Sequence, residues 1–283
     1  MPLDFRRRWM YVRIRHWRGL GVVTLLCLAF ANVAHASDES NLTKEQIKHF
    51  LLTAKIVGSR QSGKGVTHPW RLTLSDGTIT HDASFQSIDQ SQSNIQFANR
   101  DTEINFVDSY KYNLAAYALA ELLGIDDMLP VYVERTWKGD SGSLSWWLPV
   151  NMDEADRRRQ QIYAPDTEAW NKQMYRVRVF DQLVYDKDPN PTNVLIGPNW
   201  EIWRIDFTRA FRRSKDLKSP EELVRCDRKL LERLKVLDEN ELAVKTKHYL
   251  NKDEVKALMA RRDKIVAHFQ QLIAKKGEND VLY

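Results

Sequence analysis

The sequence has 283 residues, of which 43% are hydrophobic and 29% are charged, enough for one large domain or two small lobes. Its formal charge of +5 would suit a nucleic-acid partner if the charge were spread over the chain. Residues 1–36, however, hold six arginines and one aspartate, so they carry the whole excess and the remainder is neutral. We therefore expect no nucleic-acid partner.

The first 36 residues have the three parts of a secretory signal peptide. An arginine-rich segment precedes the apolar run "GLGVVTLLCLAFANVAHA", which ends in the small-residue cleavage pattern Ala34-His35-Ala36. This run is short for a membrane span, which needs about 20 residues. We expect cleavage after Ala36, a secreted or periplasmic protein and no membrane span after cleavage. The alternative is a retained N-terminal membrane anchor.

The two cysteines predict no disulfide in the mature chain. Cys27 lies in the apolar run and would leave with the signal peptide. Cys226 would then be alone, and its surroundings "EELVRCDRKLLERL" predict a helix in which it faces the core.

From residue 43 the pattern predicts a helix followed by three strands. Thr43, with Gln46 three residues later, forms a capping-box pattern at the start of a helical period. Alternating runs follow, and the turn at residues 75–77 predicts a hairpin into the third strand. A loop between the first two strands is expected to carry three glycines: Gly58, Gly63 and Gly65.

The next segments complete a predicted α+β fold with two lobes. The stretch "SYKYNLAAYALAELLG" predicts a helix that ends at Gly124, and two antiparallel strands follow it. Helices dominate from residue 153, including one over residues 166–185 and one that starts at Ser219-Pro220. We expect an N-terminal lobe of sheet and one helix over residues 37–150, a mainly helical lobe over residues 151–283, and a ligand cleft between them.

The stretch "YDKDPNPTNVLIGPNWEIWRIDFTRAF", residues 185–211, carries the most specific pattern. Four residues separate Asp188 from Asn193, and Asp206 follows thirteen residues after Asn193, with two short apolar runs between them. Phosphoryl transfer needs a carboxylate near the acceptor hydroxyl, and a carboxylate and an amide oxygen to hold Mg²⁺. Kinases supply these groups as D-x-x-x-x-N, a strand pair and a metal-binding aspartate.

This stretch resembles the protein-kinase-like superfamily, with the closest match to its atypical members. These are the phosphatidylinositol 3- and 4-kinases, the HipA-type bacterial kinases and the secreted Fam20-like kinases; the chain also looks like an uncharacterised bacterial family of secreted kinase-like proteins. "DPNPTNVLI" and "WRIDFTRAF" match their D-x-H-x-x-N loop and I-D-F element, with Asn190 at the usual histidine position. The resemblance implies ATP- and Mg²⁺-dependent phosphoryl transfer to an unknown protein or small-molecule acceptor. It also implies that Asp188 is the catalytic base or the acid that orients the acceptor, and that Asn193 and Asp206 are metal ligands.

The sequence departs from the kinase pattern in the N-terminal lobe. Gln86 occupies the position of the phosphate-binding lysine on the third strand, and Asn113 occupies that of its glutamate partner on the helix. These two amides could hydrogen-bond one another and keep the geometry without the charge. Another cation could then hold the phosphates: Lys64 in the glycine loop, Lys111 at the helix start, or Lys55. The predicted nucleotide-binding set is Gly58, Gly63, Lys64, Gly65, Gln86 and Lys111.

Three functional hypotheses remain open from the sequence. The first is an active kinase-like phosphotransferase, and the second is a pseudokinase that acts as a binding or scaffold module of the cell envelope. The third is a structural envelope protein whose aspartates and asparagines only build turns, as these residues commonly do. A location outside the cytoplasm counts against ATP as the donor in the phosphotransferase hypothesis, because such compartments hold little ATP.

Overall fold

The computed structural model describes residues 42–63, 69–96 and 102–283, which belong to one compact unit. The predicted signal segment, Lys64 and Gly65 lie outside the described residues. No helix in the described part of the chain has the length and apolar character that crossing a membrane requires.

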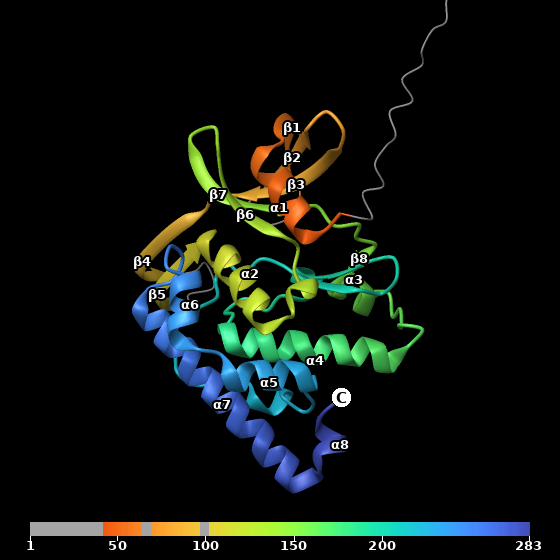
Figure 1. The fold of residues 1–283 in the computed structure, drawn as a ribbon, viewed down its shortest axis with the longest axis vertical. Coiled ribbons are helices and arrows are strands. Elements are labelled where there is room, and N and C mark those ends of the chain that lie inside the picture. Colours follow the sequence, from red (N-terminus) through yellow and green to blue (C-terminus); the bar gives the residue numbers. More distant parts are fainter. Residues whose placement is uncertain (1–41, 64–68, 97–101) are drawn as a thin grey trace, which may run out of the picture. The chain divides into compact units, whose positions relative to one another are not determined.

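A five-stranded antiparallel sheet in the order β1-β2-β3-β7-β6 forms the N-terminal part. Helices α1 (Lys44–Thr53) and α2 (Lys111–Leu123) both contact β6 and β7 (Figure 1). The strands of the sheet are β1 (Lys55–Gln61), β2 (Trp70–Ser75), β3 (Thr80–Gln86), β6 (Tyr132–Trp137) and β7 (Asp140–Trp146).

The predicted caps and turns of this part are confirmed. Thr43 caps α1 and forms the capping box with Gln46. The β2–β3 hairpin turns at Gly77, whose φ of 93° favours glycine, and Gly124 ends α2 in the left-handed region with φ 66°. Helix α1 ends at Thr53, because Ala54 is extended and leads into β1.

A second hairpin between β3 and α2 was missing from the sequence prediction. It pairs β4 (Asp89–Gln96) with β5 (Thr102–Ser109) as a separate two-stranded sheet. The β4 sequence "DQSQSNIQ" is almost entirely polar, so it shows no apolar alternation from which a strand could be recognised.

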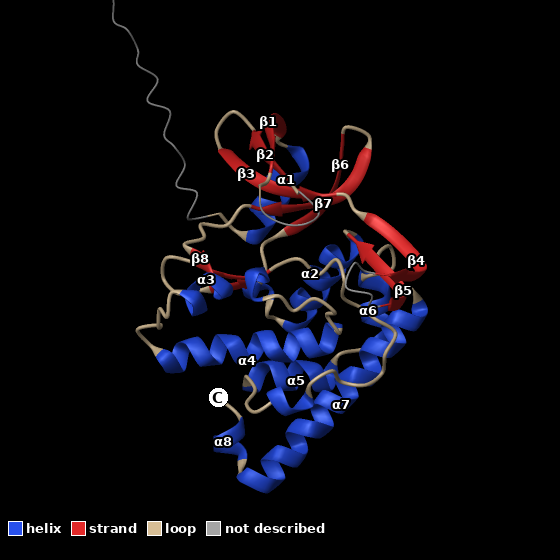
Figure 2. Cartoon of the chain, turned by 180° about the vertical axis from the view of Figure 1, so that it is seen from behind, coloured by secondary structure: helices blue, strands red, loops and turns tan. Residues whose placement is uncertain are grey.

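Helices dominate the C-terminal part, as predicted, and Figure 2 shows them in blue opposite the red five-stranded sheet. A small sheet in the order β10-β9-β8 accompanies them. Its strands are β8 (Met152–Asp153), β9 (Val194–Ile196) and β10 (Ile202–Arg204). The helices are α3 (Glu154–Arg159), α4 (Thr167–Val184), α5 (Arg228–Val236), α6 (Glu239–Lys245), α7 (Lys252–Lys276) and α8 (Glu278–Val281). The α+β fold class is therefore confirmed.

The predicted helix start at Ser219-Pro220 is wrong. Only one 3₁₀ turn, Pro220–Glu222, forms there, and α5 begins at Arg228. The reason is a better cap further along, because the Asp227 carboxylate accepts a hydrogen bond of 2.9 Å from the Leu230 amide. Cys226 is a buried free thiol, as predicted, but it lies in a β-bridge to Leu282 and not in a helix.

Candidate functional site

The strand pair expected between Asn193 and Asp206 is present, and residues 185–211 form a loop, two short strands joined by a turn, and a second loop. Helix α4 ends at Tyr185 in the left-handed region, with φ 50°. A polar loop with the 3₁₀ turn η3 (Pro191–Asn193) follows, and then β9 pairs with β10. Asp188 therefore lies in the loop between α4 and β9, Asn193 at the start of β9, and Asp206 just after β10.

Two neighbours of Asp188 build the turn in this loop. The Asp186 carboxylate accepts from the Asp188 amide at 3.0 Å, and the Asn190 side chain accepts from the Thr192 amide at 3.0 Å. Asn190, which the sequence resemblance assigns to the usual histidine position, is thus the cap of η3. Asp188 itself is exposed, and its carboxylate makes no hydrogen bond or ion pair to any described residue. That carboxylate is available to a ligand.

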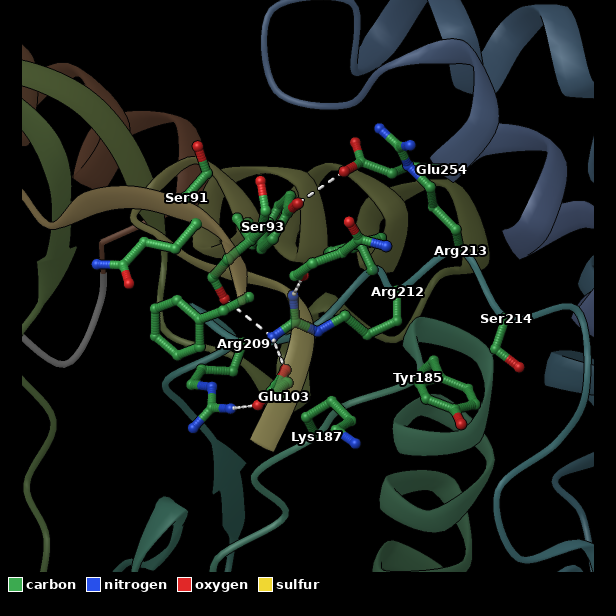
Figure 3. Close-up of a pocket in the computed structure, with 16 residues that line it drawn as sticks. Ser91, Ser93, Glu103, Tyr185, Lys187, Arg209, Arg212, Arg213, Ser214 and Glu254 are labelled. Carbon is green, nitrogen blue, oxygen red and sulfur yellow. Dashed lines mark hydrogen bonds and ion pairs between the residues drawn. The ribbon is translucent and has the colours of Figure 1, made fainter. Parts of the chain in front are cut away.

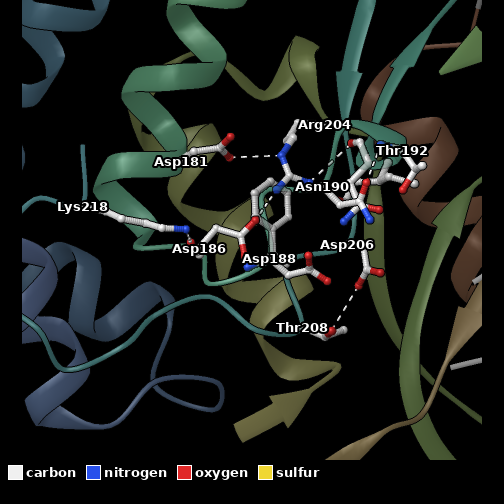
Figure 4. Close-up of polar contacts among 12 residues, drawn as sticks. Asp181, Asp186, Asp188, Asn190, Thr192, Arg204, Asp206, Thr208 and Lys218 are labelled. Carbon is white, nitrogen blue, oxygen red and sulfur yellow. Dashed lines mark hydrogen bonds and ion pairs between the residues drawn. The ribbon is translucent and has the colours of Figure 1, made fainter. Parts of the chain in front are cut away.

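A buried arginine fixes the position of the loop (Figure 4). The Arg204 side chain is fully buried at the end of β10, and it forms ion pairs with Asp181 of α4 at 3.1 Å and with Asp186. Its guanidinium also donates to the backbone carbonyl of Asn193 at 3.4 Å. Burial raises the pKa of Asp181 to about 6, against the opposing effect of Arg204. The arginine therefore holds helix, loop and strand together.

Asn193 and Asp206 are brought together by the backbone. The Ile205 amide donates to the Asn193 carbonyl at 3.0 Å, so the residue before Asp206 is bonded directly to Asn193. Two oxygen-bearing side chains thereby lie on neighbouring segments. Magnesium prefers oxygen ligands and is commonly held by one or two carboxylates together with waters and phosphates.

Asp206 has the character of a cation ligand. It is half-buried, and its φ of 60° is unusual for a residue other than glycine. Burial raises the pKa of its carboxyl group, and the negative charges of Asp108 and Asp186 raise it further, although Thr208 donates a hydrogen bond of 3.1 Å. A bound cation would compensate these costs, so the residues fit a divalent metal.

Asp108, at the end of β5, is a nearby carboxylate that the sequence analysis missed. It is 9% exposed, and its Oδ1 atom has no hydrogen-bond partner among the described residues. The amide of the next residue, Ser109, donates to the Thr208 carbonyl at 2.9 Å, which places Asp108 beside the segment that follows Asp206. No group of three or more His, Cys, Asp or Glu side chains suited to a metal occurs in the described ranges. The metal prediction thus rests on Asn193 and Asp206.

The predicted hydrogen bond between Gln86 and Asn113 is confirmed. The Asn113 side chain donates to Gln86 Oε1 at 2.7 Å and to Ser143 Oγ at 3.1 Å. Its Oδ1 atom accepts from the Phe207 amide at 2.8 Å. Asn113 therefore connects β3 and β7 to the residue that follows Asp206, and it does so without a charge.

The residues predicted to bind nucleotide are dispersed. Gly58 does not lie in the glycine loop: it is inside β1, at a bulge where it pairs with Thr73. An added Cβ would meet the Thr73 side chain at 3.4 Å, an ordinary van der Waals distance. Gly63 is exposed just after β1, where the loop begins. Lys111 forms an ion pair of 2.7 Å with Asp89 of the β4–β5 hairpin.

No protein-family model and no curated protein matches the sequence. Solved structures do match. A hydra Fam20 structure with sugar has a TM-score of 0.61 at 16% identity, covering 87% of this chain and 93% of that one. The Golgi casein kinase with Mn/ADP bound has a TM-score of 0.60 at 13% identity, covering 84% and 78%. Another structure of the Golgi casein kinase gives 0.60 at 13% identity, covering 84% and 77%. The chain therefore has a kinase-like fold of the Fam20 type.

Proposed function

We propose that this chain is a secreted or periplasmic phosphotransferase that uses a divalent metal and ATP or another nucleoside triphosphate. The observation that carries the proposal is the arrangement around Arg204. It holds a loop on which the Asp188 carboxylate is free and Asn193 is bonded to the residue before Asp206. The shared fold with a Golgi casein kinase structure that contains Mn/ADP supports nucleotide and metal binding. The signal-type N-terminus supports the location.

In this proposal each polar residue has one task. Asp188 accepts the proton of the acceptor hydroxyl, and Asn193 and Asp206 hold the metal. The metal, when bound, neutralises the charge of the transferring phosphoryl group. Asn113 keeps the Asp206 segment against the sheet through the Phe207 amide. The loop predicted to lie over the phosphates begins at Gly63 and continues outside the described residues.

One observation favours a second candidate, a pseudokinase that acts as a binding module. The Gln86–Asn113 hydrogen bond replaces the lysine–glutamate ion pair with a neutral contact of 2.7 Å. Without that lysine the phosphates lose a positive partner, which weakens electrostatic stabilisation of the transition state. In this case the site would bind nucleotide without transferring the phosphoryl group.

Phosphoryl transfer from radiolabelled ATP, to protein or to water, tests the proposal directly. We expect Mg²⁺- or Mn²⁺-dependent transfer, and Asp188→Asn should lower the rate about 10²- to 10⁴-fold because it removes the base. Asp140→Asn, at the exposed first residue of β7, is the matched control and should keep the rate. Nucleotide binding with no transfer under any condition would favour the pseudokinase, and an unchanged rate in Asp188→Asn would contradict the mechanism.

A further inference from the structure

A large pocket lies beside the candidate site, among residues that the sequence analysis did not single out for binding. It encloses about 1010 Å³, at the upper end of the range for small-molecule sites. Its walls come from the β4–β5 hairpin, the segment after Asp206, the start of α2, the end of α4 and the start of α7 (Figure 3). Its charged residues are Lys187, Arg209, Arg212, Arg213, Glu103 and Glu254.

Two of these cations place the pocket next to the groups proposed for phosphoryl transfer. Lys187 immediately precedes Asp188, and Arg209 follows Asp206 by three residues. The Lys187 amide donates to the Arg209 carbonyl at 3.4 Å, so the two segments meet at the pocket wall. A molecule in the pocket therefore contacts the residue that immediately precedes Asp188, whereas Asp188 itself does not line the pocket.

Both acids of the pocket are already engaged by protein groups. Glu103 accepts from Arg209 and, at 2.7 Å, from Arg212 (Figure 3). Glu254 accepts from the Tyr112 hydroxyl at 2.7 Å and from the Asn251 amide at 2.8 Å. Each carboxylate thus connects segments of the pocket wall, and neither carboxylate is free to bind a cationic ligand.

The positive charges that the two acids of the pocket do not neutralise belong to Lys187 and Arg213. Lys187 is exposed and makes no ion pair with a described residue. The Arg213 side chain is 62% exposed, and its ion pair with Asp253 is long, at 4.0 Å. Because such an exposed, long pair contributes little, both cations are available to an anion that enters the pocket.

The uncharged polar side chains of the lining suit hydroxyl groups. The uncharged polar side chains exchange hydrogen bonds with hydroxyls as donors or acceptors. They come from both strands of the hairpin and from the segment before α5: Ser91, Gln92, Ser93, Asn105 and Ser214.

We propose that this pocket is the acceptor site, and that the acceptor is a small hydroxylated molecule with an anionic group, a phosphate or a carboxylate. The inference rests on the proposed phosphotransferase function. Lys187 and Arg213 hold the anionic group while one hydroxyl faces Asp188. In the transfer, the bond from the terminal phosphorus to the bridging oxygen of the nucleotide breaks, and a new bond forms to the acceptor oxygen. The hydroxyl proton passes to Asp188, and the nucleoside diphosphate leaves.

Calorimetric binding to the purified protein tests the pocket with matched probes. Glycerol 3-phosphate and glucuronate carry hydroxyls and a charge, whereas glycerol and glucose carry hydroxyls alone. We expect the charged probes to bind and the neutral ones not to bind. Lys187→Gln and Arg213→Gln should each weaken binding about tenfold, the effect of losing one charge-assisted hydrogen bond. The controls Lys229→Gln and Arg233→Gln change equally exposed cations on α5 and should bind as the wild type does.

The outcomes separate this inference from the proposed function. Asp206→Asn should still bind the charged probes but lose nucleotide binding. Lys187→Gln should still bind nucleotide but bind the charged probes more weakly. Equal binding of charged and neutral probes, or unchanged binding in both pocket variants, would overturn the anionic site. Binding of an acidic serine-containing peptide without binding of either small anion would overturn the small-molecule class. Probe binding by a protein that binds no nucleotide would refute the acceptor role and the proposed function together.

Discussion

Two buried polar clusters hold the candidate site, and they differ in charge. The Arg204 cluster (Arg204, Asp181, Asp186) joins α4, the Asp188 loop and β10 through ion pairs. The Asn113 cluster (Asn113, Gln86, Ser143) joins α2, β3 and β7 through neutral hydrogen bonds. Both reach the Asp206 segment, because Arg204 lies two residues before Asp206 and Asn113 binds the Phe207 amide.

The difference shows that one site can be held by a charged cluster and a neutral one. The Asn113 cluster connects sheet, helix and Asp206 segment at the positions that the sequence resemblance assigns to the kinase ion pair, yet it offers no positive charge to a phosphate. The Arg204 cluster is buried and charged, so it depends on complete pairing. Removing one residue from each cluster should therefore lower the free energy of unfolding by different amounts.

The largest effect is expected from Arg204→Met, which leaves the fully buried Asp186 carboxylate without its cation. Breaking a buried ion pair in this way costs about 3–5 kcal/mol of unfolding free energy. Urea denaturation measures this change. The matched control is Arg159→Met, because Arg159 pairs with Asp156 at the surface at 2.6 Å. Its loss should cost no more than about 1 kcal/mol. Equal losses of unfolding free energy in Arg204→Met and Arg159→Met would show that the Arg204 cluster does not stabilise the fold.

A smaller effect is expected from Asn113→Leu. This change removes the acceptor of the buried Phe207 amide, and one unsatisfied buried group costs about 1–3 kcal/mol. Nucleotide affinity should fall as well, since Asp206 is the neighbour of Phe207. Gln86→Leu serves as the comparison, because it removes one hydrogen bond and leaves the Phe207 amide satisfied. If Gln86→Leu lowers the free energy of unfolding and the nucleotide affinity as much as Asn113→Leu does, the hydrogen bond from the Phe207 amide to Asn113 does not account for the losses.

The smallest expected effect is on the pH dependence of the unfolding free energy. It distinguishes the charged Arg204 cluster from the neutral Asn113 cluster. Burial raises the pKa of Asp181 from 3.8 to about 6. Between these two values the folded state retains a proton that the unfolded state releases, so this group makes stability fall as pH rises from about 4 to 6. Asp181→Asn removes that contribution and should flatten the pH profile of the unfolding free energy over this window, whereas Gln86→Leu should leave its slope unchanged. A slope as steep in Asp181→Asn as in the wild type would contradict the assignment.

The sequence was sufficient for features that depend on local pattern. The capping box at Thr43, the glycine turns at Gly77 and Gly124 and the strand pair between Asn193 and Asp206 all follow from neighbouring residues. The Gln86–Asn113 contact was also predicted, because the kinase resemblance places the two positions opposite each other.

The features that the sequence missed depend on distant contacts or on polar segments. The Arg204 cluster joins residues from three elements, and nothing near Arg204 indicates that it is buried. Asp108 and the acceptor pocket depend on the β4–β5 hairpin, whose first strand is too polar to be recognised. Gly58 was misplaced because a bulge inside β1 and a loop glycine look alike in sequence.

The central claim is that Asn193 and Asp206 form a metal-dependent nucleotide site. Calorimetric titration of ATP into the protein, with and without Mg²⁺ or Mn²⁺, tests it most directly, alongside Asp206→Asn and the control Asp140→Asn. We predict binding that requires the metal, that is unchanged in Asp140→Asn and that weakens at least about tenfold in Asp206→Asn, a loss of about 1.4 kcal/mol. Absence of binding at millimolar ATP with either metal, or equal binding in Asp206→Asn, would contradict the claim.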